Sequence, residues 1–280
     1  MNFNKIKSYA KINLALNIIS KSKDLHKIES LVAFIDLYDL IKIKKIKSKN
    51  HKIKFYGKFS KNINSNNTVS KLLRILDEKN LINQKFYIKI KKNIPQKSGL
   101  GGGSMNAANV LRYLIIKNMI KINTKQIYKI AKMVGSDVIL GLNIKNSILT
   151  SNNKIKRFSN CKKLYTLIIK PNFGCSTKYI YSNVRKFDKS QFNNPSKKMF
   201  NLDFLKNMNN SLEKIVLDKY LTLKKIKSYL NNLKDPIFVR MTGSGSAFVS
   251  YYYSKKQCER AKKQFNKDYN KFWCISSKTI

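Results

Sequence analysis

Hydrophobic and polar residues alternate near the start of the chain, between residues 8 and 18. Because successive side chains of a β-strand lie on opposite faces, this pattern predicts a strand with one apolar face. That face carries Ala10, Ile12, Leu14, Leu16 and Ile18. Lys11 and Asn13 share the other face, so the strand is expected to place two polar side chains next to each other.

The same alternation recurs in the first half of the chain and predicts a substantial sheet there. The further strand positions are Ile41 and Ile43, Ile53 and Phe55, and Phe86, Ile88 and Ile90. The apolar residues then change to helical spacing, which predicts a helix that begins at Ser104 as its N-cap. A second helix is expected from an N-cap at Thr124 to Gly135, a residue typical of helix ends.

Strand and helix patterns also alternate in the second half of the chain. Strands are expected at 164–169, 237–241, 247–252 and 272–275, and helices at 178–184, 200–216, 220–233 and 255–265. Interleaved elements of both kinds predict an α+β protein with mixed sheets and helices packed on them. The polar segment 151–154 predicts a boundary between two domains, residues 1–153 and 154–280.

The charge of the chain is strongly unbalanced, with 58 Lys and Arg against 14 Asp and Glu and a formal net charge of +44. Such a balance can indicate a nucleic-acid partner, because basic side chains release counterions from phosphates. Only six of the basic residues are Arg, and the lysines run through every segment instead of forming one block. We therefore favour AT-biased coding over a dedicated polyanion site.

Four cysteines, Cys161, Cys175, Cys258 and Cys274, are far apart in the sequence. They form no Cys-x-x-Cys pair, which favours free thiols over a zinc site. Charged residues interrupt every hydrophobic stretch before it could span a bilayer. We therefore expect a soluble, cytoplasmic protein without a membrane partner.

The strongest chemical signal is the segment 95–108, PQKSGLGGGSMNAA, between a predicted strand and a predicted helix. Four of the ten glycines of the chain fall in positions 99–103. Glycine lets the backbone approach a ligand closely, and a helix amino terminus offers free N–H groups and a positive dipole end. The segment predicts a phosphate-binding loop, with a flexible turn as the structural alternative. It matches neither the Walker motif nor the dinucleotide motif.

A second glycine cluster, MTGSGSAF at residues 241–248, joins two predicted strands of the second half. A hairpin turn would explain it structurally. Two glycine loops on separate domains also suit an active site in a cleft, with one loop packed near the other.

Three segments in this order resemble the three motifs of the GHMP kinases. They are SYAKINL at residues 8–14, the loop at 95–108 and TGSG at 242–245. Within this superfamily, the GLGGGSxNAA form of the loop, Lys11 with Asn13, and KPNFGCST at 170–177 resemble one branch. That branch phosphorylates a cytidine diphosphate-linked methylerythritol in the non-mevalonate isoprenoid pathway.

The resemblance implies an N-terminal ATP-binding domain like a ribosomal protein and a ferredoxin-like C-terminal domain. It implies ATP with Mg²⁺ as the phosphoryl donor and the 2-hydroxyl of the methylerythritol unit as the acceptor. The matching loop residues would bind ATP: Pro95, Gly99, Leu100, Gly101, Gly102, Gly103, Ser104 and Asn106. The resemblance assigns no metal ligand here, and it leaves monomer and homodimer open.

Catalysis is assigned by the resemblance to Asp137 and Lys11. Phosphoryl transfer needs positioning, charge neutralisation and a group that receives or orients the hydroxyl proton. Asp137 matches the catalytic aspartate of the family, although an aspartate after a helix-ending glycine can also cap the next helix. Lys11 would stabilise the developing alkoxide, and Asn13 would hydrogen-bond the acceptor.

The remaining site residues also come from the resemblance. His26 matches a histidine that reads cytosine, Tyr181 matches an aromatic that stacks on the base, and Thr177 matches a substrate-binding position. The C-terminal glycine loop supplies Thr242, Gly243, Ser244 and Gly245.

The chain departs from the family pattern at four positions. Leu25 stands where an aromatic residue usually precedes the histidine, and this motif is one residue short. Ser98 replaces the first loop glycine, Met105 replaces the second serine, and Ile139 replaces a proline that usually follows Asp137. Met105 removes a hydroxyl that could assist phosphate or Mg²⁺, whereas the loop backbone should still function.

Two alternatives stay open at this point. Another GHMP kinase, acting on homoserine or mevalonate, would keep the ATP site and change the acceptor pocket. A lysine-rich RNA-binding protein is the alternative from a different class, because a ribosomal-protein-like fold does not decide function. Basic and aromatic side chains on one face would favour RNA, whereas convergence of Lys11, Asp137 and the glycine loop would favour a kinase.

The spread of lysine predicts that the protein has no dedicated polyanion site. RNA or duplex DNA should bind weakly at low salt and be released at physiological salt, because charge-only contacts are screened. Fluorescence anisotropy across a salt series measures this. Retention of either ligand at about nanomolar affinity in physiological salt would contradict the prediction.

Overall fold

The computed structural model describes residues 2–22 and 25–280, whose contacts divide into two compact units. The first unit comprises residues 1–10, 37–96 and 101–144, and the second comprises residues 11–36, 97–100 and 145–280. Strands β1 (Asn4–Ser22) and β2 (Leu25–Ile46) contribute residues to both units. The predicted division into two domains, residues 1–153 and 154–280, stays a prediction.

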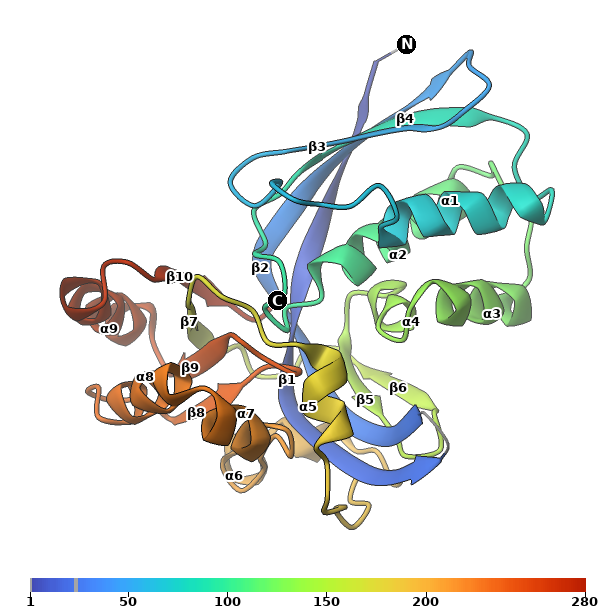
Figure 1. Ribbon diagram of the computed structural model, residues 1–280. Helices are drawn as coiled ribbons and strands as arrows, with labels where there is room; N and C mark the ends of the chain where they lie inside the picture. The colour runs from blue at the N-terminus through green and yellow to red at the C-terminus, as the bar shows by residue number, and fades with distance from the viewer. Residues whose placement is uncertain (1, 23–24) are drawn as a thin grey trace. The chain divides into compact units, whose positions relative to one another are not determined.

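The first unit is a sheet with helices on one side (Figure 1). The second half of β2 runs antiparallel to β4 (Lys85–Lys91), which pairs in parallel with β3 (Lys52–Tyr56). The predicted strand positions in β2 and β4 are confirmed, since Ile41, Ile43, Phe86, Ile88 and Ile90 are buried. The helices are α1 (Thr68–Glu78), α2 (Gly102–Ile116), α3 (Thr124–Val134) and α4 (Val138–Gly141).

Two predicted helix starts in this unit are wrong. Helix α2 has Gly101, not Ser104, as its N-cap, and Gly101 adopts the left-handed conformation with φ 70°. Helix α3 has Asn123, not Thr124, as its N-cap, because Asn123 and Gln126 form a reciprocal capping box. The earlier start of α2 matters for the site, because it places the amino end of the helix among the glycines at 99–103.

Helix α1 was not expected from the sequence, although its signal is present there. Asn67 caps the helix by accepting hydrogen bonds from the N–H groups of Val69 and Ser70. The apolar residues at helical spacing are buried: Val69, Leu72, Leu73, Ile75 and Leu76. Helix α1 packs against α2 and so supports the element that begins at the glycine loop.

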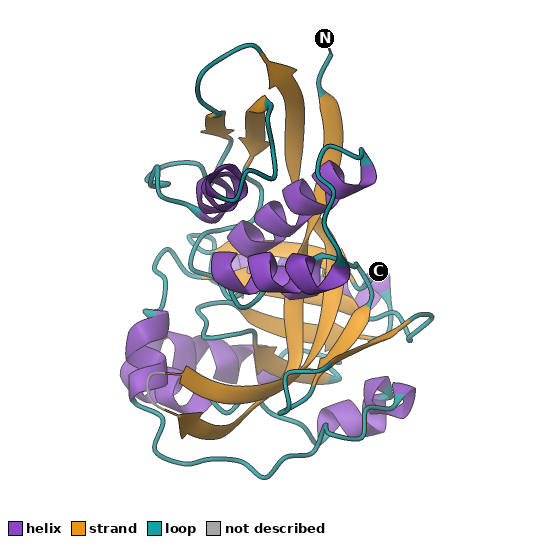
Figure 2. Cartoon of the chain, turned by 90° about the vertical axis from the view of Figure 1, so that its right-hand side faces the viewer, coloured by secondary structure: helices purple, strands orange, loops and turns teal. Residues whose placement is uncertain are grey.

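The second unit contains a four-stranded antiparallel sheet in the order β10-β7-β9-β8. Its strands are β7 (Tyr165–Lys170), β8 (Phe238–Met241), β9 (Phe248–Tyr252) and β10 (Trp273–Lys278). Helices α8 (Leu221–Asn231) and α9 (Lys255–Asp268) pack against it (Figure 1 and Figure 2). This order of strands and helices confirms the expected ferredoxin-like arrangement.

The rest of the second unit includes β1 from residue 11 onward, and β1 pairs with β2. Here β2 also pairs with β5 (Asn146–Leu149), and β5 pairs with β6 (Ile155–Phe158). Residues 10–18 of β1 are all buried, so both faces of the predicted strand lie in protein interior. Lys11 and Asn13 are therefore buried polar residues.

The single helix expected at 200–216 is wrong, because the segment forms shorter pieces. These are η1 (Lys197–Phe200), α6 (Leu202–Lys206) and α7 (Glu213–Lys219), while α5 (Thr177–Ser182) agrees with the expected helix before them. Between α6 and α7 the backbone pairs with β1 instead of with itself. Leu16 donates its N–H to the carbonyl of Asn209, and Ser211 donates its N–H to the carbonyl of Leu16.

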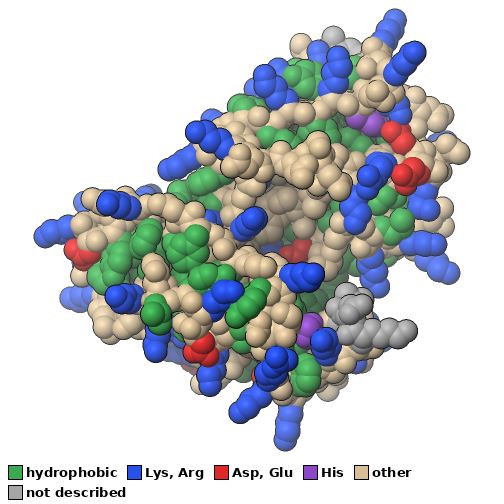
Figure 3. Space-filling view, in the orientation of Figure 1, with side chains coloured by type: hydrophobic (Ala, Val, Ile, Leu, Met, Phe, Trp, Pro, Cys, Tyr) green, Lys and Arg blue, Asp and Glu red, His purple; other side chains and the backbone are tan. Residues whose placement is uncertain are grey.

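Lysine and arginine side chains are scattered over the face drawn in Figure 3 and do not gather into one block there. All four cysteines are free thiols, as expected. Among the residues that the structure describes, no helix combines the length and apolar character needed to cross a membrane.

Candidate active site

The amino end of α2 has no side-chain cap. Gly101 cannot cap the helix with a side chain, and no acidic residue lies in the first turn. The N–H groups of the first turn have no partner within a helix, so they are available to an anion that the helix dipole also attracts. The first intrahelical bond runs from the N–H of Met105 to the carbonyl of Gly101.

Two glycines of the loop have little space for a side chain inside the first unit. A Cβ on Gly102 would lie 3.0 Å from a methyl carbon of Ile94 and 3.3 Å from Nζ of Lys92. A Cβ on Gly103 would lie 3.2 Å from Oγ1 of Thr68. Thr68, the first residue of α1, donates its hydroxyl hydrogen to the carbonyl of Gly103 over 2.7 Å. These contacts place the start of α2 firmly.

In the second unit, residues 97–100 of the loop pack against the C-terminal glycine loop. A Cβ on Gly99 would lie only 1.9 Å from the carbonyl oxygen of Thr242, and Gly99 has φ +76°. Thr242 donates its hydroxyl hydrogen to the carbonyl of Gly99 over 3.2 Å. The N–H of Ala247 also donates to the carbonyl of Ser98 over 3.2 Å. The structure thus brings these two segments together.

Lys11 and Asn13 form one hydrogen-bonded group with Thr242. Nζ of Lys11 donates to Oδ1 of Asn13 over 2.6 Å, and the backbone N–H of Asn13 donates to Oγ1 of Thr242 over 3.0 Å. Nδ2 of Asn13 donates to Oγ of Ser30 over 2.8 Å. The backbone N–H of Lys11 donates to the carbonyl of Leu100 over 3.1 Å. A cation is therefore held in a fixed position beside both glycine-loop segments of this unit.

Asp137 occupies the N-cap position of α4 in the first unit. Its side chain makes no capping hydrogen bond to that helix, and the helix is only four residues long. The carboxylate of Asp137 therefore does not cap α4, which was the structural alternative to a catalytic role. The expected cooperation of Asp137 with Lys11 stays a prediction.

His26 and Tyr181 lie together in the second unit. Their ring centroids are 5.2 Å apart and the rings are tilted by 56°. Nε2 of His26 is buried and has no hydrogen-bond partner among the described residues. Burial, and secondly the positive charge of Lys21, lower the pKa of His26 below its ordinary value of 6.5. The imidazole is neutral at physiological pH and can use a ring nitrogen for a ligand.

The neighbouring substrate positions are linked to the C-terminal glycine loop. The hydroxyls of Thr177 and Ser244 form a hydrogen bond of 2.9 Å. Gly243 and Gly245 have φ +55° and +83°, so this loop needs its glycines. Asp24 and the side chain of Leu25 lie outside the described residues, so the expected effect of Leu25 on base stacking stays a prediction.

Sequence reasoning missed residues that hold the C-terminal glycine loop and the turn at residues 171–173. Nδ2 of Asn210 donates to the carbonyls of Met241 and Gly243 over 2.9 and 2.8 Å. Nζ of Lys170 donates to the carbonyls of Pro171 and Phe173 over 2.7 and 3.0 Å, and burial lowers its pKa. Asn210 sits where the expected helix breaks, and the segment rich in Asn and Ser at 207–211 was the available signal.

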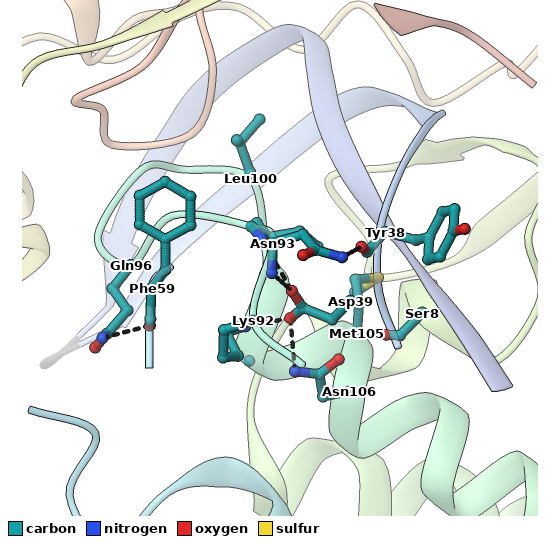
Figure 4. A network of polar contacts seen from close by, with 12 residues as sticks. Ser8, Tyr38, Asp39, Phe59, Lys92, Asn93, Gln96, Leu100, Met105 and Asn106 are labelled. Carbon is teal, nitrogen blue, oxygen red and sulfur yellow. Dashed lines mark hydrogen bonds and ion pairs between the residues drawn. The ribbon is translucent and has the colours of Figure 1, made fainter. Parts of the chain in front are cut away.

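The other predicted loop residues are mostly interior. Pro95 and Leu100 are buried at the two sides of the loop. Met105 lies in the core, where its sulfur would be 2.9 Å from a Cβ on Gly141. Asn106 is buried as well and donates from Nδ2 to Oδ2 of Asp39 over 2.9 Å (Figure 4). Direct contact of Asn106 with ATP stays a prediction.

No group of three or more His, Cys, Asp or Glu side chains within residues 2–22 and 25–280 is arranged to hold a metal ion.

Known proteins with similar sequences and folds show the class to which this chain belongs. The family described as "GHMP kinases N terminal domain" matches residues 67–144. A crystal structure of 4-(cytidine 5'-diphospho)-2C-methyl-D-erythritol kinase superposes with a TM-score of 0.78 at 22% identity, covering 98% of this chain and 99% of that one. Homoserine kinase from Cytophaga hutchinsonii superposes with a TM-score of 0.67 at 16% identity, covering 100% and 97%. Fold and glycine loops together define a GHMP kinase.

Two curated relatives narrow the class. The 4-diphosphocytidyl-2-C-methyl-D-erythritol kinase of Pelagibacter ubique (strain HTCC1062) is 57% identical over 281 residues, which is 100% of both chains. The enzyme of the same name from Clostridium tetani is 34% identical, covering 99% of this chain and 100% of that one. This chain belongs to the 4-diphosphocytidyl-2-C-methyl-D-erythritol kinase family. Neither the homoserine or mevalonate alternative nor the RNA-binding alternative is supported.

The close approach of Gly99 to Thr242 predicts that Gly99→Ala destabilises the protein. The left-handed backbone alone costs an alanine about 1–2 kcal/mol, and the Thr242 carbonyl must also move. Gly135→Ala is the control, since Gly135 has an extended φ of 172° and a Cβ there would meet no atom closer than 3.7 Å. Urea denaturation measures both. Equal free energies of unfolding for the two variants would contradict the prediction.

Proposed function

We propose that this protein transfers the γ-phosphoryl group of ATP to the 2-hydroxyl of 4-diphosphocytidyl-2-C-methyl-D-erythritol, as a kinase of the non-mevalonate isoprenoid pathway. The observation that carries the proposal is the full-length, 57% identical relative of that name. The buried Lys11–Asn13 pair and the uncapped amino end of α2 supply the chemistry that such a transfer needs.

The amino end of α2 would bind the phosphates of ATP. Its free N–H groups and the helix dipole favour negative charge, and no carboxylate in the first turn opposes it. Mg²⁺ would arrive as part of the nucleotide substrate, where it neutralises phosphate charge. The loop therefore positions the donor mainly through its backbone.

Asp137 and Lys11 would act on the acceptor. The acceptor O–H bond breaks as its oxygen bonds to the γ-phosphorus, the bond from that phosphorus to the bridging oxygen breaks, and ADP leaves. Asp137 orients and accepts the hydroxyl proton, while the Lys11 ammonium stabilises negative charge on the attacking oxygen. The hydrogen bond to Asn13 holds that ammonium in place, so little reorganisation is needed during the reaction.

His26 and Tyr181 would hold the cytosine base. A neutral imidazole can both donate and accept a hydrogen bond, and the buried Nε2 of His26 gains a partner when the base binds. The ring of Tyr181, which lies against His26, offers a stacking surface. Other bases would present the wrong edge and leave buried polar atoms unpaired, which gives specificity.

Further expectations accompany this activity. We expect the enzyme to work in the cytoplasm on soluble metabolites, as a monomer or a homodimer, without a nucleic-acid or membrane partner.

Asp137→Asn should lower turnover by about a hundredfold or more and leave ATP affinity nearly intact, because the lost charge acts chiefly in the transition state. Lys11→Ala should behave in the same way. Lys5→Ala is the control, since Lys5 is an exposed lysine on the same strand. Steady-state kinetics and calorimetric ATP binding provide the measurements. Near-normal turnover of the Asp137 variant would remove this residue from the mechanism.

The lowered pKa of His26 predicts a specific pH dependence. The KM for the acceptor should stay constant from alkaline pH down to about 6.5, and should rise only in more acidic solution, where the imidazole gains a proton. His26→Gln should raise this KM and abolish the acidic rise. His51→Gln, at the other histidine of the chain, should keep it. If the KM for the acceptor still rises at acidic pH in the His26 variant, the rise comes from another titrating group.

Acceptor choice tests the proposed function most directly. ATP consumption should be observed with 4-diphosphocytidyl-2-C-methyl-D-erythritol and not with homoserine, mevalonate or galactose. Activity confined to homoserine or mevalonate would overturn the cytidine assignment and leave a kinase. Absence of both activity and ATP binding would overturn the kinase assignment itself.

A further inference from the structure

A buried carboxylate in the first unit, that of Asp39 on β2, accepts four hydrogen bonds (Figure 4). Asp39 is 0% exposed. Its Oδ1 accepts from the backbone N–H groups of Asn93 and Ile94 over 2.8 and 2.9 Å. Its Oδ2 accepts from Nδ2 of Asn106 over 2.9 Å and from Nζ of Lys92. All four donors come from the two segments that flank the glycine loop.

The donors to Asp39 lie on both sides of the glycines at 99–103. Asn93 and Ile94 follow β4 and lead into the loop, whereas Asn106 lies in the second turn of α2, just after the glycines. One carboxylate therefore fixes the backbone before the loop and the helix after it. Glycine-rich segments lose much conformational entropy on ordering, so fixing both sides limits the conformations that the loop can adopt.

Lys92 connects this network to the phosphate-binding end of α2. Its side chain is 5% exposed and its ammonium forms a buried ion pair with Asp39. The same ammonium lies beside Gly102, at the start of the helix. A buried ammonium without a counter-ion is unfavourable, and here it would also lie at the positive end of the helix dipole. The carboxylate of Asp39 supplies that counter-ion.

We propose that Asp39 is a positioning residue for ATP: it holds the entry and exit of the glycine loop so that the first turn of α2 stays open to phosphate. This inference rests on the proposed function of the loop as a phosphate site. Asp39 touches no substrate in this role. It acts through the backbone of Asn93 and Ile94, through Asn106 and through Lys92.

A buried carboxylate could also contribute to stability alone. A matched control separates that role from the positioning of the ATP loop. Glu29 in the second unit is 0% exposed too. Its carboxylate accepts from Nδ2 of Asn17, Oγ of Ser190 and the N–H of Gln191 over 2.9, 2.8 and 2.7 Å. It holds a loop at residues 190–192, away in sequence from both glycine loops. Glu29→Gln should reproduce a loss of stability without the effect on ATP.

The test compares Asp39→Asn with Glu29→Gln in the full-length protein, at a temperature below both melting transitions. Calorimetry with a non-hydrolysable ATP analogue should show about a tenfold or larger rise in Kd for Asp39→Asn and less than about a twofold change for Glu29→Gln. The KM for the acceptor should change less than about twofold in Asp39→Asn, since its base-binding residues lie elsewhere.

Asp39→Glu is the second variant, to be used if the asparagine variant does not fold. It keeps the charge for Lys92 but displaces the carboxylate by one methylene, so ATP affinity should fall by a smaller factor of about three to ten. Unchanged ATP affinity in a folded Asp39 variant would overturn the inference, as would equal loss in Glu29→Gln. A wild-type enzyme that binds ATP but prefers another acceptor would contradict only the proposed acceptor.

Discussion

The contact between Gly99 and the carbonyl of Thr242 is the constraint on which the site in the second unit depends. The two backbones approach so closely that a side chain at position 99 has no space. From this contact the other fixed distances follow. Thr242 bonds to Asn13, Asn13 accepts from Lys11, and the backbone of Lys11 bonds to Leu100, next to Gly99. This closed ring of contacts holds a buried ammonium in place.

Local patterns predicted the elements that carry this ring. Alternation placed Lys11 and Asn13 on one face of β1, and the density of glycine marked the phosphate loop. The N-cap of α2 was misplaced because Ser104 has the right side chain for a cap. The structure uses a left-handed glycine instead, which leaves the N–H groups open. A functional terminus departs here from the commonest capping rule, as sites often do.

Long-range contacts account for what the sequence could not reveal. Asp39 reads as an ordinary residue just before the predicted strand positions Ile41 and Ile43, and its partners are 53 to 67 positions away. Asn210 likewise bonds to carbonyls about thirty positions later, and its segment pairs with β1. Nothing in a local window distinguishes the buried Lys92 and Lys170 from the many exposed lysines. Burial and fixed partners, which only the fold supplies, set these two apart.

The core position of Met105 has a consequence for how such a site persists during evolution. With no second serine hydroxyl, the proposed recognition of phosphate would fall mainly to backbone N–H groups, which every residue type except proline possesses. Six of the ten glycines lie in the two loops. Glycine codons begin with two guanines, so a genome drifting toward adenine and thymine removes glycine readily elsewhere. In such a genome, selection would need to act on only a handful of codons to keep this site even if the surrounding surface changed to lysine and asparagine.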